Sequence, residues 1–108
     1  MKIWYTENML TREELIEKLR KESDSLKIDF GVKRIAIFGS FADNTQTVHS
    51  DVDVVIELAK PLGFKFFDLV ERLEKVVGKK MDILTVDALK TMRVKQVARS
   101  IEESLLYV

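Results

Sequence analysis

A short apolar run that ends in glycine places the strongest constraint on the fold. Residues 34–38 (RIAIF) precede Gly39 and show no alternation of polar and apolar side chains. A strand that lies at a surface alternates, whereas a run of this length without alternation is typical of a strand covered on both faces. The run therefore predicts a central strand of a sheet.

A second strand is predicted over residues 51–58 (DVDVVIEL), after a polar, turn-forming loop at 43–50 (DNTQTVHS). Side chains alternate along a strand, so its residues divide between two faces. One face carries Val52, Val54 and Ile56. The other face carries Asp51, Asp53, Val55 and Glu57. The second strand thus presents acidic side chains on one side only.

Two helices are indicated by their caps and by apolar spacing. Thr11 and Glu14 form a capping box, which predicts a helix from about Arg12 to about Ser25. A second helix is expected over residues 64–77, before Gly78 as C-cap. Its apolar stripe consists of Phe66, Phe67, Val70, Leu73 and Val77, and we interpret it as core packing.

The remaining elements complete an α+β order. Residues 80–85 are a third strand candidate, Asp87 is the expected cap of helical segments that extend to about Glu103, and residues 105–108 are a candidate edge strand. No repeat, linker or low-complexity segment interrupts residues 1–108. We expect one α+β domain over residues 1–108, a small mixed sheet flanked by helices.

The composition restricts the ligands and the kinds of metal site that are expected of this chain. The 18 Lys and Arg balance the 18 Asp and Glu, so stable nucleic-acid binding by this chain alone is disfavoured. No cysteine and a single histidine exclude thiolate and multi-histidine metal sites, which leaves carboxylates as metal ligands. No apolar run is long enough for a membrane span and no signal peptide is recognisable, so a cytoplasmic protein without membrane contact is expected.

Three carboxylates are the candidate metal ligands. Asp51 and Asp53 lie about 6–7 Å apart on one face of a strand, where they repel each other. If the third strand joins the same sheet, Asp82 stands on that face too. Oxygen ligands of this kind suit Mg²⁺, and three of them are typical of a two-metal site for in-line displacement.

Gly39 and Ser40 are the candidate phosphate-binding residues. If the first two strands are antiparallel neighbours, this turn lies beside Asp51 and Asp53, and a glycine there permits close approach of backbone to a ligand.

Each motif also has an ordinary interpretation. Taken alone, Gly39-Ser40 is typical of a turn, and DxD is typical of a solvated strand entry. Lys79 and Lys80 offer Asp82 an ordinary ion pair. His49 is interpreted as a loop residue and left out of the site.

The combination of motifs is more specific than any one of them. FGS at 38–40, SDVD at 50–53 and a strand Asp82 after an intervening helix resemble the nucleotidyltransferase superfamily with the DNA polymerase β-like palm. The small size is similar to the minimal nucleotidyltransferase (MNT) group, the antitoxins of MNT-HEPN toxin-antitoxin pairs. The resemblance covers about residue 11 to the C-terminus.

The resemblance implies an activity, a cofactor and a partner. AMP would pass from ATP to a hydroxyl, a tyrosine of a HEPN ribonuclease toxin, with Mg²⁺ required. Gly39 and Ser40 would hold the triphosphate, Asp51 and Asp53 would bind the metals, and Asp82 would bind one metal and activate the hydroxyl. The chain departs from the family pattern at Asp43-Asn44, where Arg-Gly is usual.

Two other functions stay open. One is an antitoxin that neutralises its partner by occlusion without catalysis. The other is a small-molecule or RNA nucleotidyltransferase, for whose acceptor domain 108 residues leave no room. Interface material is expected in residues 3–5 and 105–108, for which core or sheet-edge packing is an equal interpretation.

Overall fold

The computed structural model describes residues 9–108, and a four-stranded mixed sheet forms its centre. The strands are β1 (Val32–Phe38), β2 (Val52–Leu58), β3 (Met81–Thr85) and β4 (Leu106–Tyr107). Their order is β3-β2-β1-β4, with β2 and β3 parallel and the other pairs antiparallel. The α+β class and the central position of β1 are confirmed. Residues 3–5, named above as interface material, lie outside the described residues.

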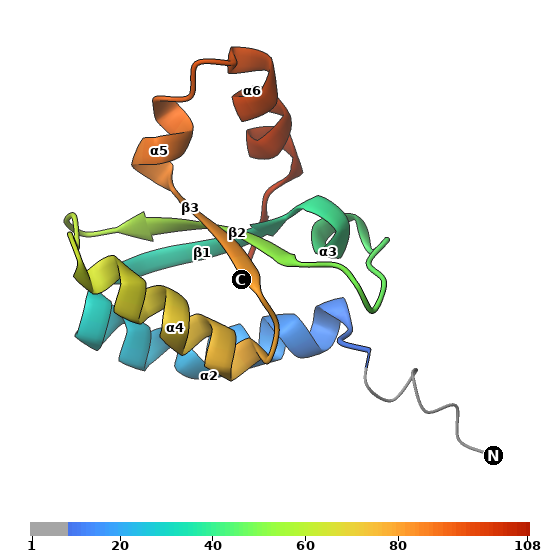
Figure 1. Cartoon of the computed structure of the whole chain (residues 1–108), viewed down its shortest axis with the longest axis horizontal. Helices are drawn as coiled ribbons and strands as arrows, with labels where there is room; N and C mark the ends of the chain where they lie inside the picture. Colours follow the sequence, from blue (N-terminus) through green and yellow to red (C-terminus); the bar gives the residue numbers. More distant parts are fainter. Residues whose placement is uncertain (1–8) are drawn as a thin grey trace.

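Helices cover both faces of the sheet (Figure 1). On one face lie α2 (Arg12–Phe30) and α4 (Lys65–Val77), and on the other lie α5 (Val86–Lys90) and α6 (Lys95–Ser104). The short α3 (Gly39–Asp43) follows β1 directly. Along the part of the chain that the structure describes, no helix combines the length and apolarity needed to cross a bilayer.

The first helix is longer than its predicted end at Ser25. It continues to Phe30 and closes on Gly31, whose φ of 70° is left-handed. Ser23 and Ser25 lie inside the helix, and their hydroxyls donate to carbonyls three residues back. Leu26 and Phe30 then continue the buried stripe, so packing on the sheet outweighs the local preference of serine.

The predicted cap at Asp87 is wrong. Thr85 is the N-cap of α5, since its Oγ1 accepts a hydrogen bond of 3.0 Å from the Ala88 amide. The helical region beyond it is two helices, α5 and α6, with a break at 91–94. The predicted edge strand at 105–108 is present as the two-residue β4, beside Ala36 and Ile37 of β1.

Two apolar cores lie on opposite faces of the sheet. The larger lies under α2 and α4 and includes Val52, Val54, Ile56, Leu69 and Leu73. The smaller contains Val55, Leu89 and Ala98, under α5 and α6. The predicted alternation of β2 is therefore confirmed, and Asp53 lies on the face of the smaller core.

Replacing Leu73 on α4 tests the larger core. Leu73 is fully buried, so Leu73→Ala should lower the free energy of unfolding by about 2–4 kcal/mol, through lost burial and a residual cavity. The prediction that Phe67 belongs to the core is wrong, because its side chain is 69% exposed on the same helix. Phe67→Ala should therefore change the free energy of unfolding by no more than about 0.5 kcal/mol. Urea unfolding measures both, and equal losses would contradict this assignment of the core.

Candidate active site

The Asp53 and Asp82 carboxyls meet on the face of the sheet that carries α5 and α6. The two residues are directly paired across the parallel strands β2 and β3, so their side chains leave the sheet in the same direction. Partial burial, together with the charge of Asp82 and a hydrogen bond to it, raises the pKa of Asp53 to about 6, and the charge of Asp51 adds to this. The expectation that Asp82 lies on the same face of the sheet as Asp53 is therefore confirmed.

Gly39 brings the end of β1 directly against Asp53. Phe38 pairs with Asp53 across β1 and β2, and Gly39 follows with a φ of 70°. A Cβ on Gly39 would collide with Asp53 Oδ2 and would lie 3.3 Å from its Cγ. Only glycine allows the backbone this approach, so the predicted neighbourhood of Gly39-Ser40 and the acidic residues is present.

Asp51 lies at the edge of this group. It is exposed, immediately before β2, and acts on Asp53 through its charge. Among residues 9–108, no three acidic or histidine side chains lie close enough together to enclose a metal ion. The structure therefore brings Asp53, Asp82 and Gly39 into one site, with Asp51 beside it.

The donor set fits a hard divalent cation. Asp53 and Asp82 offer carboxylate oxygens that repel each other in the absence of a cation, and such oxygens are what Mg²⁺ selects. The ordinary interpretation, an ion pair of Asp82 with Lys79 or Lys80, is not observed. Lys79 Nζ donates instead to the Val48 carbonyl at 3.0 Å.

The loop between β1 and β2 is held by its own polar groups. The Thr47 amide donates to Ser50 Oγ at 2.9 Å, and the His49 amide donates to Thr47 Oγ1 at 3.2 Å. The His49 side chain is exposed, in agreement with its interpretation as a loop residue.

At the end of α3, Asp43 and Asn44 occupy the two positions where Arg and Gly are usual in the family that the sequence resembles. Asn44 closes the helix with a φ of 60°, a conformation that asparagine tolerates better than other residues with a side chain. Asp43 is exposed. A guanidinium reaches this end of α3 from elsewhere, since Arg12 Nη1 donates to the Ala42 carbonyl at 3.0 Å. Sequence reasoning missed Arg12, because a contact across 30 residues has no local signal.

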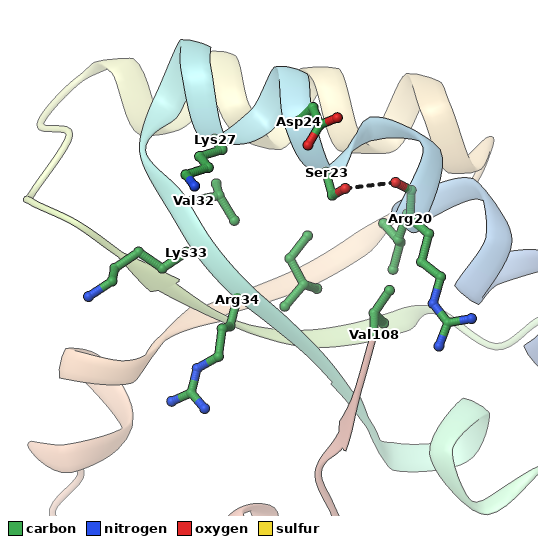
Figure 2. Close-up of a pocket in the computed structure, with 10 residues that line it drawn as sticks. Arg20, Ser23, Asp24, Lys27, Val32, Lys33, Arg34 and Val108 are labelled. Atoms are coloured by element: carbon green, nitrogen blue, oxygen red, sulfur yellow. Dashed lines mark hydrogen bonds between the residues drawn. The ribbon is translucent and has the colours of Figure 1, made fainter.

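A hollow of about 240 Å³ lies away from these carboxylates, between α2 and the first half of β1 (Figure 2). Four cations surround it: Arg20, Lys27, Lys33 and Arg34. Arg34 is already paired with Glu57 at 2.6 Å, and Asp24 is the only carboxylate side chain among the residues that line the hollow. The two neighbouring carboxylates that could hold a divalent cation are Asp53 and Asp82, outside this hollow, so we place the candidate active site there.

Comparison with known proteins identifies the family of this chain. The family model described as a nucleotidyltransferase domain matches residues 13–108, and the chain belongs to that family.

Two curated relatives are close to full-length matches. "Putative protein adenylyltransferase MJ1379" of Methanocaldococcus jannaschii is 41% identical, over 93% of this chain and 100% of the relative. Protein adenylyltransferase MntA of Thermococcus cleftensis is 34% identical, over 86% of this chain and 95% of the relative.

Solved structures share the fold. A "putative minimal nucleotidyltransferase" superposes with a TM-score of 0.70 at 20% identity, over 90% of this chain and 95% of the other. A chain of a toxin-antitoxin crystal structure, MntA-HpeT, superposes with a TM-score of 0.58 at 20% identity, over 93% and 72%. The minimal nucleotidyltransferase fold expected from the sequence is confirmed.

Gly39→Ala tests the close approach to Asp53. The added Cβ meets Asp53 Oδ2 and the backbone keeps a left-handed φ, so we expect a loss of about 2–4 kcal/mol in the free energy of unfolding. Gly63→Ala is the matched control, with a φ of 59° and no atom within 4 Å of the added Cβ, and should lose only about 1 kcal/mol. Thermal unfolding compares them, and equal losses would show that the contact with Asp53 is unimportant.

Asp53→Asn tests the repulsion between the carboxyls. Asp53 is partly exposed, so after solvent screening we expect a gain of about 0.5–1 kcal/mol at pH 7 without divalent cation. Folding raises the pKa of Asp53 from 3.8 to about 6, so the folded wild type binds more protons in that range and loses stability as pH rises through it. The stability gained by the variant over the wild type should be complete above about pH 6 and absent below about pH 4. Melting temperatures measured in EDTA at several pH values check this, and a variant less stable than wild type at pH 7 would contradict it.

Proposed function

We propose that this chain is a Mg²⁺-dependent protein adenylyltransferase that transfers AMP from ATP to a hydroxyl group of a partner protein. The contact between Asp53 and Asp82, beside the glycine that ends β1, is the observation that carries the proposal. Its family supports nucleotidyl transfer, and its relatives' names support a protein acceptor. We propose that residues 1–108 act as one domain of this kind, in the cytoplasm, where ATP and Mg²⁺ are available.

Asp51, Asp53 and Asp82 would hold Mg²⁺, and Gly39 and Ser40 would bind the triphosphate. Bound Mg²⁺ supplies neutralisation of the phosphate charge and of the charge that develops on the leaving group. The acceptor oxygen attacks the α-phosphorus, the bond to the α,β-bridging oxygen breaks, and pyrophosphate leaves. Asp82 would take the proton of the acceptor hydroxyl, since its carboxylate is exposed on the site face.

The partner is proposed to be a HEPN ribonuclease toxin, modified on tyrosine. The supporting observations are the MntA name of one relative and the MntA-HpeT toxin-antitoxin structure that shares this fold. Asp51 and Asp82 are exposed to solvent, and a site of this kind would rely on the acceptor protein to position its own hydroxyl. The chain would then act as the antitoxin of the pair.

Label transfer tests the activity and its residues. The chain is incubated with its toxin partner and ATP labelled on the α-phosphate, and label should appear on the toxin only with Mg²⁺. Asp53→Asn and Asp82→Asn should each reduce transfer by at least about 100-fold, because charge stabilisation by the metal carries most of the rate. A tyrosine acceptor is confirmed if tyrosine-to-phenylalanine replacement in the toxin abolishes labelling.

Glu57→Gln is the matched control for these variants. Glu57 lies on the same face of β2 but is paired with Arg34, and an exposed pair contributes little to stability, so transfer should be unchanged. Toxin neutralisation that persists in Asp53→Asn, without label, would favour occlusion over catalysis. Absence of label with the wild-type chain and an intact toxin would reject the proposed function.

A further inference from the structure

Lys80 lies at the entry of β3, on the same face as the candidate active site. The Lys80 carbonyl accepts a hydrogen bond of 3.2 Å from the Val52 amide, so the pairing of β2 with β3 extends back to this residue. Met81 points into the larger core and Asp82 points to the opposite face. Side chains alternate along the strand, so Lys80 is on the side of Asp82 and next to Asp51 across the ladder.

Lys80 is free to meet a ligand. Its side chain is exposed, and no ion pair within residues 9–108 uses it. Its neighbour Lys79 differs, because Lys79 Nζ is bound to the Val48 carbonyl. Lys79 also lines a hollow on the other face, together with Glu14 and Lys18 of α2. Two adjacent lysines are thus divided between the two faces of the sheet.

The charge of the site favours a cation at this position. A nucleoside triphosphate brings several negative charges to a site that already holds Asp51, Asp53 and Asp82. A lysine ammonium on a flexible stem is a compact point charge suited to phosphate oxygens, and it attracts them over several ångströms at a partly exposed site. Asp43, at the end of α3, contributes a further negative charge rather than a positive one.

We propose that Lys80 binds the polyphosphate of the nucleotide and so makes the site selective for triphosphate over monophosphate. This inference rests on the proposed function, since it assumes that the nucleotide occupies the face of Asp53 and Asp82. It assigns to Lys80 direct contact with substrate, whereas Lys79 holds the loop before β2.

The role of Lys80 is tested by measuring nucleotide affinity rather than catalysis. Dissociation constants for ATP and AMP are measured by calorimetry with Mg²⁺ for the wild type, Lys80→Gln and Lys80→Arg. Lys80→Gln should weaken ATP binding about tenfold, the value of one charge-assisted contact, and leave AMP binding unchanged. Lys80→Arg, which keeps the charge, should restore most of the ATP affinity.

Lys75→Gln is the control for net charge. Lys75 is exposed on α4, on the far face of the sheet, and forms an ion pair with Glu71, so its loss should leave both affinities unchanged. Melting temperatures of all variants identify any that is misfolded.

The possible failures are distinct. If folded Lys80→Gln weakened the binding of ATP and AMP equally, or weakened neither, the role of Lys80 would be overturned. Label transfer by the wild-type chain would in that case still support the proposed function. A wild-type chain that binds no ATP at all, with or without Mg²⁺, would overturn the proposed function and this inference together.

Discussion

The contact between two carboxyls on neighbouring parallel strands is the interaction on which the candidate site depends. Asp53 and Asp82 repel each other when both are ionised, and the pairing of β2 with β3 holds them together. That pairing is stabilised from the other face, where Val52, Val54 and Met81 of the same strands are buried in the larger core. The apolar face thus offsets the electrostatic cost of the acidic one.

The two faces of the sheet differ in how completely they are covered. Long helices α2 and α4 cover one face, whereas α5 and α6 are short and the core beneath them is small (Figure 1). The site occupies the less covered face, where β1 ends at α3 and β2 and β3 begin. The sheet therefore holds the acidic residues on the face that the helices cover less completely.

Most of the fold was predictable because its signals are local. The Thr11 cap, the apolar run of β1 and the alternation of β2 depend on neighbours within a few residues, and the structure confirms all three. Predictions failed where distant packing outweighs local preference. The first helix continues past Ser25 because Leu26 and Phe30 are buried by the sheet. Thr85 rather than Asp87 is the N-cap of α5, because β3 ends at Thr85.

The candidate site was predictable in its members but not in its arrangement. The sequence by itself determined which residues carry chemistry, since the alternation of β2 places Asp53 opposite Val52 and Val54, and the resemblance singles out Gly39 and Asp82. Only the tertiary structure decided that Phe38 and Asp82 both pair with Asp53, which brings Gly39 and a second carboxyl against it while Asp51 stays at the edge. The tertiary structure alone also showed that Arg12 reaches the end of α3 and that Lys80 lies on the face of the candidate site. Strand register and helix docking arise from burial of apolar surface over the whole chain, and no short segment encodes them.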